Sequence, residues 1–398
     1  MKDTLKLVVK YLIRNLSKVY YIFPIKRNRI LFMSTLGKQY SCNPKYIYEY
    51  MLNKNEFKQR DLEIVWCFKQ PKNFKNIFSP SDKIINKNNI LIYLYYLLTS
   101  KVIVYNCGGF SYVPIRNEQL LIETWHGGGA FKKIGFSVEN KSDSSKKGIE
   151  LASRDIKLFL SSSLISSKLV IKEAMKYNGE ILNSGSPRND ILVKNDDEFK
   201  ATIKRKLGFE KDEKIVLYAP TFKGSESKAV SINEKYETLC VKSLKKSLEK
   251  RFGYKWKVAV RGHQYNDEMK LDNIDIDLSK YPDMQELLLI TDVLITDYSS
   301  SIWDFALLDR PCFLFSPDIE EYKNKERGFF INIEEWPGII AINNKHLENE
   351  ILNYNETLYL TKVRKFKDDM KSYEEGNACE KVSNYILNYL NTESDRKK

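Results

Sequence analysis

Two of the three histidines in the chain follow apolar runs that read as strands, where an α/β protein can place acid–base side chains. His126 comes before three glycines, and His263 stands two residues after Arg261. A neutral imidazole titrates near neutral pH and suits the removal of a proton from a hydroxyl group. A lone histidine is more often structural, so a catalytic role requires other site residues at the same strand ends. His346 lies in a polar region and is expected at the surface.

The three glycines after His126 give a substrate room to approach the backbone, and Lys132 supplies positive charge close by. A flexible turn is the alternative explanation. The run does not match the glycine fingerprint of dinucleotide-binding proteins, because the helix start and the acidic residue are not where that motif needs them.

A hydroxyl-rich turn follows the apolar run at 293–295. It holds Asp297, Ser299 and Ser300, and a helical pattern that contains Asp304 begins directly after it. A strand, a hydroxyl-rich turn and a helix start together present backbone N–H groups and the positive end of a helix dipole to one spot. The sequence therefore predicts an anion site here, with a well-capped helix that binds nothing as the alternative.

The elements that must position these residues alternate between strands and helices in two successive series, which predicts two parallel sheets covered by helices. We therefore predict an α/β fold of two Rossmann-like domains that face a cleft, with the division near residue 207. The two domains would comprise residues 1–206 and 207–398. Ligands of such sheets bind beyond the carboxyl ends of the strands, where His126, His263 and the turn at 296–301 stand.

The bulk composition is that of a globular chain of two domains: 398 residues, 42% hydrophobic and 29% charged. Six scattered cysteines without a C-x-x-C pair indicate reduced thiols and a cytoplasmic location. Asp275-Ile-Asp277 resembles the D-x-D that holds a metal in some sugar transferases, but such tripeptides are common in acidic loops. No other metal motif is visible, and we expect neither a metal nor a cofactor. The net charge of +13 raises the possibility of nucleic-acid binding, but no known nucleic-acid motif is present.

The first 30 residues hold eight basic residues against one acid. Within them, Lys6, Lys10, Arg14 and Lys18 recur every four residues beside an apolar face, which predicts an N-terminal amphipathic helix. Such a helix can lie on an anionic membrane surface as a peripheral anchor. The alternative is a helix docked on its own domain with a solvated basic face. No stretch is long and apolar enough to read as a spanning helix.

Five motifs in chain order resemble those of the CDP-glycerol glycerophosphotransferase family, the wall teichoic acid primases and polymerases and their capsule relatives. They lie between about residues 120 and 318, and the first 115 residues carry little of the resemblance. The motifs are Thr124-Trp-His-Gly127 with Lys132-Lys133-Ile-Gly135, Gly185-Ser-Pro-Arg-Asn-Asp190, Tyr218-Ala-Pro-Thr-Phe-Lys223, Arg261-Gly-His263, and Ile295-Thr-Asp-Tyr-Ser-Ser300 with Asp304 and Pro311.

The resemblance implies a GT-B-like fold, a CDP-alditol donor, a lipid-linked glycan or polyol-phosphate acceptor, and a place on the cytoplasmic face of the membrane. It makes His126 the catalytic base and places Arg261 and His263 at the donor pyrophosphate. The residues expected to contact substrate are Gly127, Gly128, Lys132, Arg188, Thr221, Lys223, Asp297, Ser299, Ser300 and Asp304.

The chain departs from the family pattern at two places. Gly128-Gly129 stands where many members have Thr-Pro, and Lys223 stands where many have Arg. Lysine replaces a forked donor with a point charge that still suits phosphate. The alditol (glycerol, ribitol or another), the acceptor, and the choice between primase and polymerase stay open. So do three other functions: a GT-B glycosyltransferase that uses a nucleotide sugar, a scaffold without chemistry, and a basic nucleic-acid binder.

Overall fold

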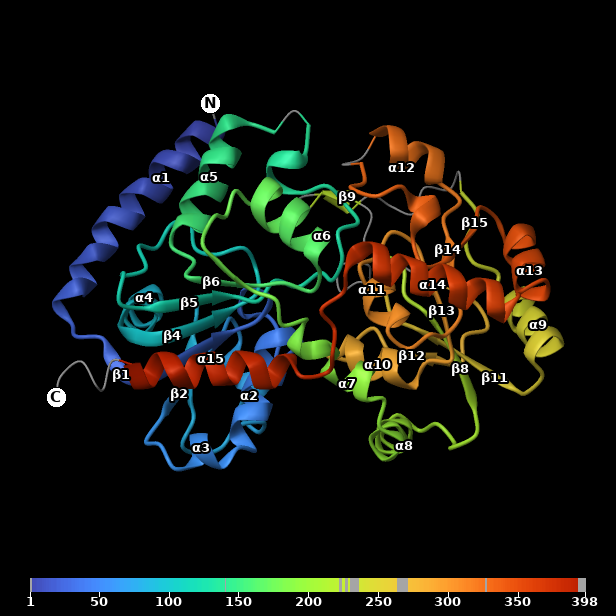
Figure 1. Ribbon diagram of the computed structural model, residues 1–398, viewed down its shortest axis with the longest axis horizontal. Coiled ribbons are helices and arrows are strands. Elements are labelled where there is room, and N and C mark those ends of the chain that lie inside the picture. The colour runs from blue at the N-terminus through green and yellow to red at the C-terminus, as the bar shows by residue number, and fades with distance from the viewer. Residues whose placement is uncertain are drawn as a thin grey trace. The chain divides into compact units, whose positions relative to one another are not determined.

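The computed structural model of the protein describes residues 2–139, 141–221, 224–225, 228–229, 236–262, 271–325 and 328–392. The chain divides into two compact units (Figure 1). The first unit comprises residues 1–127, 133–190 and 372–398, and the second comprises residues 128–132 and 191–371.

The first unit is built on a seven-stranded sheet in the order β3-β2-β1-β4-β5-β6-β7, in which every pairing is parallel. The strands are β1 (Lys26–Met33), β2 (Glu63–Phe68), β3 (Lys83–Asn86), β4 (Ser100–Tyr105), β5 (Leu120–Glu123), β6 (Leu158–Leu160) and β7 (Glu180–Leu182). The α-helices are α1 (Lys2–Leu16), α2 (Cys42–Leu52), α3 (Asn55–Lys58), α4 (Ile90–Thr99), α5 (Asp143–Arg154), α6 (Leu164–Ser166), which continues as a π-helical segment over Ser167–Ala174, and α15 (Ala378–Thr392).

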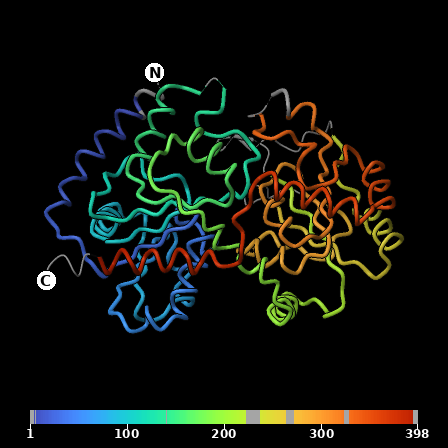
Figure 2. The backbone as a smooth tube through the Cα atoms, in the orientation of Figure 1, coloured from blue at the N-terminus to red at the C-terminus, as the bar shows by residue number. Residues whose placement is uncertain are grey.

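Both faces of this sheet are buried, as the apolar character of its strands requires. Successive residues of β1 alternate between the faces: Leu31 belongs to a core closed by α4, and Phe32 to a core closed by α2 and α15. In the second of these cores Val382 and Ile386 of α15 are fully buried. The C-terminal helix is therefore a structural part of the first unit, and the trace shows it beside α2 (Figure 2).

The second unit holds a six-stranded parallel sheet in the order β12-β11-β8-β13-β14-β15. Its strands are β8 (Lys214–Tyr218), β11 (Trp256–Val260), β12 (Ile276–Asp277), β13 (Val293–Thr296), β14 (Cys312–Phe315) and β15 (Ile339–Ala341), with a small antiparallel pair of β9 (Gly224–Ser225) and β10 (Lys228–Ala229). The helices are α8 (Asp197–Lys206), α9 (Val241–Phe252), α10 (Met284–Ile290), α11 (Ser301–Ala306), α12 (Ile319–Lys325), α13 (Asn344–Leu352) and α14 (Glu356–Met370), while α7 (Asp190–Lys194) begins at the division between the units.

The structure confirms an α/β fold with two parallel sheets, but the units do not divide at residue 207. Helix α8 belongs to the second unit, where it packs near α10, and residues 372–398 belong to the first. Hydrophobic periodicity reports that a helix has an apolar face without reporting which core receives it. The facing of the two units across a cleft stays a prediction.

Candidate active site

His126 lies in the first unit, three residues beyond the end of β5. Its Nδ1 is 2.7 Å from the carbonyl oxygen of Asn106, in the turn after β4. A carbonyl only accepts hydrogen bonds, so Nδ1 carries the proton and donates it, and Nε2 keeps its lone pair. The side chain is exposed to solvent, yet the protein atoms that surround it lower the pKa of His126 below its ordinary value. His126 is therefore neutral near pH 7, with Nε2 as the basic atom.

Glu123, the last residue of β5, fixes the backbone on both sides of this hydrogen bond. Its buried carboxylate accepts the N–H groups of Gly108 (2.7 Å) and Gly109 (2.8 Å) from the turn after β4, and that of Trp125 (2.9 Å) beside His126. Trp125 has φ = +54°, a conformation that a non-glycine residue keeps only when its surroundings hold it there. Burial raises the pKa of Glu123, and the three N–H donors oppose that shift because they favour the ionised carboxylate.

Arg188 and Asn43 hold the same segment from other elements. The Arg188 guanidinium donates to the carbonyl oxygen of His126 (2.5 Å) and contacts Cys42 Sγ (3.3 Å). The amide of Asn43 donates to the carbonyl oxygens of Thr124 (2.8 Å) and Trp125 (3.0 Å) and accepts the N–H of Arg188 (3.0 Å). Arg188 is expected to contact substrate; in the structure its buried side chain contacts the backbone of His126.

The other residues of the Gly185–Asp190 motif join the C-terminal segment. Glu374 accepts the N–H of Ser186 (2.9 Å) and the side-chain amide of Asn189 (3.1 Å). The carboxylate of Asp190 accepts the first N–H groups of α15, from Ala378 (2.9 Å) and Cys379 (2.8 Å). The motif therefore links the His126 segment to the helix that completes the first core.

A small polar cavity adjoins His126 within the first unit. Its walls include Asn43, Ser161, Ser162 and Ser186, and its volume of ≈ 10 Å³ gives room for about one water molecule. The serines follow β6 in a turn that sequence reasoning did not select. The signal was present, because three consecutive serines between a strand and a helix repeat the pattern of residues 299–301.

The segment after His126 passes into the second unit at Gly128. A side chain at Gly128 would place its Cβ 1.9 Å from Cδ1 of Trp303, the third residue of α11. The sequence predicted that Gly128 makes room for substrate, but the structure shows that it makes room for Trp303. Phe131 then packs against Trp336 and Phe366, with ring centroids 4.7 and 5.9 Å away. Lys132 lies 5.5 Å from the centre of the Tyr322 ring.

In the second unit, the turn after β13 is joined to the end of β8. The buried carboxylate of Asp297 accepts the N–H of Thr221 (2.9 Å), and the hydroxyl of Thr296 donates to the carbonyl oxygen of Ala219 (2.6 Å). The Thr221 hydroxyl is buried and has no hydrogen-bond partner among the described residues. A buried hydroxyl without a partner is costly, and a bound ligand would supply one.

The hydroxyls of the same turn are half-buried. Ser299 Oγ accepts from the N–H (3.2 Å) and the hydroxyl (2.9 Å) of Ser301. Ser300, which precedes α11, makes no side-chain capping bond, so the predicted capping role falls on Ser299 instead. Asp304 is buried and accepts from Gln285 Nε2 (3.1 Å), which gives this residue an internal role.

Arg261 follows β11 at the same edge of this sheet. Its guanidinium donates to the carbonyl oxygen of Tyr281 (3.4 Å), and burial lowers its pKa. Arg261 and the loop from Thr296 to Ser301 thus stand at the carboxyl ends of strands of one sheet, where ligands of such sheets bind. His263 and Lys223, which the motifs also place in this site, lie outside the described residues.

Comparison with known proteins identifies the family. The family described as CDP-Glycerol:Poly(glycerophosphate) glycerophosphotransferase matches residues 15–388. A teichoic acid poly(glycerol phosphate) polymerase from Bacillus spizizenii is 32% identical over 404 residues, covering 96% of this chain and 99% of that protein. A teichoic acid glycerol-phosphate transferase from Staphylococcus aureus is 27% identical over 402 residues, covering 97% of this chain and 100% of that protein. A polymerase of the first kind from Staphylococcus epidermidis is 31% identical, and the chain spans 51% of its length.

Solved structures agree. The wall teichoic acid polymerase TagF superposes with a TM-score of 0.80 at 29% identity, over 98% of both chains. A UDP-GlcNAc 2-epimerase from Neisseria meningitidis reaches a TM-score of 0.51 at 12% identity, over 90% of this chain and 100% of that one, which concerns the fold alone. The chain belongs to the CDP-glycerol:poly(glycerophosphate) glycerophosphotransferase family, and is an enzyme of that transferase type.

Proposed function

We propose that this enzyme transfers glycerol phosphate from CDP-glycerol to a hydroxyl group of a lipid-linked teichoic acid or capsule glycan acceptor, with release of CMP. The observation that carries the proposal is the fixed tautomer of His126, which leaves Nε2 as a base in the Trp-His-Gly segment. A hydroxyl is a weak nucleophile until a base takes its proton. The teichoic acid relatives named above, with which the chain shares the family, transfer or polymerise glycerol phosphate.

In the proposed reaction His126 Nε2 accepts the proton of the acceptor hydroxyl. The freed oxygen attacks the phosphorus that carries the glycerol, and the bond from this phosphorus to the oxygen of CMP breaks. One ester bond forms, one anhydride bond breaks, and CMP carries away the electron pair. Negative charge grows on the phosphoryl oxygens and on CMP, so fixed donors at those atoms contribute most to the rate.

For the donor site we propose residues of the second unit. Arg261 and the backbone around Ser299 and Ser300 would face the phosphates. The Thr221 hydroxyl, which finds no partner in the part of the chain that the structure describes, would meet a donor oxygen. His263 and Lys223 complete this set by the motifs alone. One TagF variant was soaked with CDPG, and this relative superposes over 98% of the present chain at 28% identity.

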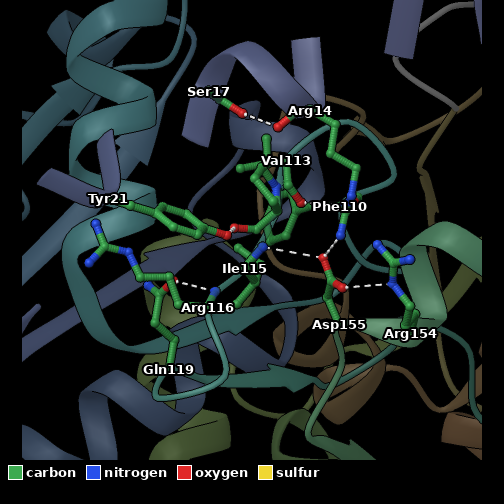
Figure 3. Close-up of polar contacts among 11 residues, drawn as sticks. Arg14, Ser17, Tyr21, Phe110, Val113, Ile115, Arg116, Gln119, Arg154 and Asp155 are labelled. Carbon is green, nitrogen blue, oxygen red and sulfur yellow. Dashed lines mark hydrogen bonds and ion pairs between the residues drawn. The ribbon is translucent and has the colours of Figure 1, made fainter. Parts of the chain in front are cut away.

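We further propose that the enzyme binds the cytoplasmic face of the membrane through α1. Leu5, Leu12 and Leu16 expose 66%, 56% and 73% of their surface, while Arg14 is buried. Arg14 pairs with Asp155 and donates to the carbonyl oxygen of Val113 (2.7 Å), as Figure 3 shows. Arg14 therefore does not belong to an exposed basic face, contrary to what the sequence predicted. It holds α1 on the protein, while the apolar side chains of the helix face outward. An exposed apolar helix face of this kind suits insertion at a lipid interface.

Among the residues that the structure describes, no helix is long and apolar enough to cross a bilayer. A spanning helix is not needed for this proposal, because interfacial insertion uses only one face of α1.

The test of the activity is incubation with CDP-glycerol, CDP-ribitol and UDP-sugars, each with a lipid-linked acceptor, followed by identification of the nucleotide released. CMP from CDP-glycerol is the expected product. CMP from CDP-ribitol alone would overturn the choice of alditol, and UDP release would make the enzyme a glycosyltransferase.

A further inference from the structure

Another pocket of the first unit lies at the end of the sheet opposite to His126. It adjoins the starts of β1, β4 and β5, whereas His126 follows the other end of β5. Its volume of ≈ 700 Å³ lies within the range of about 300–1,000 Å³ common for small-molecule sites. Its lining includes Tyr21, Arg27, Lys101, Arg116 and Glu118.

The charged side chains of this pocket favour an anion, because three cations face a single carboxylate. Lys101 is buried and donates to the carbonyl oxygen of Glu118 (2.6 Å), so its charge stays at the pocket wall. Arg27 is exposed at the rim. The two arginines supply the forked donors that suit phosphate oxygens.

Arg116 is already held in position. Its guanidinium lies 4.6 Å from the centre of the Tyr21 ring and donates to the carbonyl oxygen of Tyr20 (2.5 Å). The Tyr21 hydroxyl donates in turn to the carbonyl oxygen of Pro114 (2.9 Å), which fixes the ring (Figure 3). Burial lowers the pKa of Arg116, and its Nε has no hydrogen-bond acceptor within the described ranges. An anion in the pocket would offset this desolvation without first ordering the side chain.

The rim of the pocket indicates where the anion comes from. The short helical segment Ser17–Ile22 carries both Tyr21 of the pocket and large apolar side chains that point to solvent. Val19, Ile22 and Phe23 expose 62%, 75% and 40% of their surface. Apolar side chains beside a basic pocket match the boundary between the acyl chains and the headgroups of a bilayer.

We propose that this pocket binds the phosphate of an anionic phospholipid headgroup, while Val19, Ile22 and Phe23 enter the acyl boundary. The inference rests on the membrane association proposed above and adds a discrete lipid site to it. The site lies at the sheet edge away from the base, so it sets membrane affinity and does not take part in the transfer.

The test measures binding of the full-length protein to phosphatidylcholine vesicles with and without phosphatidylglycerol. Arg27→Gln should weaken binding to the phosphatidylglycerol vesicles about fivefold, the value of one basic group near an anionic surface. Lys58→Gln, an exposed change on α3 outside the pocket, is the matched control and should bind like the wild type. Equal losses in the two variants would overturn the proposal, because diffuse attraction would explain both.

A second variant separates the pocket from diffuse charge. Arg116→Lys keeps the positive charge but loses the two parallel donors of the guanidinium. A phosphate site in the pocket predicts weaker vesicle binding for this variant, whereas diffuse attraction predicts no change. Its melting temperature is measured alongside, and binding that stays at the wild-type level overturns the proposal. Inorganic phosphate is added as a competitor. If a low concentration of phosphate displaces the protein from the vesicles, the pocket binds free anions and not a lipid headgroup. CMP release is assayed in parallel, and its absence would reject the proposed function while leaving the vesicle comparison intact.

Discussion

The loop after β5 and the loop after β13 occupy corresponding places, each at the carboxyl end of a parallel strand, but they are held differently. The first is fixed by the side chains of Glu123, Arg188 and Asn43, which bind its N–H and carbonyl groups. The second is joined to β8 by Asp297 and Thr296, and beside it the Thr221 hydroxyl stays without a partner among the described residues.

This difference fits two roles. A base must hold one orientation before the acceptor arrives, and the scaffold around His126 provides that without any ligand. A donor site gains affinity when the ligand completes hydrogen bonds that the protein leaves open, as at Thr221. We therefore expect substitutions in the first loop to change turnover, and substitutions in the second to change donor binding.

The largest effect is expected at His126, the proposed base. His126→Ala should lower turnover by about 10²–10⁴-fold while the Kd of CDP-glycerol stays nearly unchanged. His346→Ala is the matched control, because this half-buried residue of α13 pairs with Glu350 of the same helix, outside the candidate site. Turnover near the wild-type value at saturating acceptor would show that His126 is not the base.

A smaller effect is expected from the side chains that hold the backbone of the proposed base, His126. Glu123→Gln replaces a carboxylate that accepts three N–H groups by an amide that cannot accept all of them. A buried N–H group left without an acceptor costs about 1–3 kcal/mol of folding free energy. We expect turnover to fall by about 10- to 100-fold with the KM for CDP-glycerol unchanged. The exposed change Glu139→Gln serves as the control.

A merely structural role for Glu123 can be separated from a positioning role by the pattern of kinetic constants. If Glu123→Gln raises the donor KM as much as it lowers kcat, the effect reaches both units, and the comparison of the two loops fails. A positioning role predicts that kcat alone changes.

Two threonines at the carboxyl ends of β8 and β13, Thr221 and Thr296, should respond in opposite ways to the loss of their hydroxyl groups. Thr221→Val removes a hydroxyl that has no partner among the described residues, so the free enzyme should keep its stability or gain some, while the donor KM rises about 2- to 10-fold. Thr296→Val removes a bond to the carbonyl oxygen of Ala219 and should cost about 1 kcal/mol of unfolding free energy. Calorimetry and donor kinetics on both variants decide, and a Thr221→Val enzyme with an unchanged KM would remove Thr221 from the donor site.

The sequence predicted the parts of the fold that depend on strong apolar runs. The apolar runs 158–160, 256–260 and 312–315 predict strands, and residues 284–290 predict a helix. Strands β6, β11 and β14 and helix α10 occupy those residues. Strands β3, β12 and β15 were missed because each is a short edge strand, two of them with polar ends, and β12 has only two residues. The return of α15 to the first core could not be predicted, because it depends on contacts distant in sequence.

The candidate site shows the same limit. The motifs indicated His126, Asp297 and Ser299, since their residue types stand at strand ends. They could not show that Arg188 holds the His126 carbonyl, that Asp304 bonds to Gln285, or that Gly128 lies against Trp303. Nothing in the local sequence selects Glu123 or Asn43, whose roles arise only when turns from other strands come into contact with them.

The smallest effect is expected in the pH dependence of the base. Because the surrounding protein lowers the pKa of His126, the acid limb of kcat/KM should lie below pH 6.5, the ordinary value for histidine. A depressed folded-state pKa also means that the unfolded chain binds this proton more readily. The stability linked to His126 is therefore complete above the unfolded pKa and is lost as the pH falls through the folded one. His126→Gln should remove that part of the pH dependence while keeping a polar side chain. Unfolding of the wild type and the variant in denaturant from pH 5 to 8 measures this linked stability. In the kinetic profile, an acid limb above pH 6.5 would show that the protein stabilises the charged form of His126, contrary to a preformed neutral base.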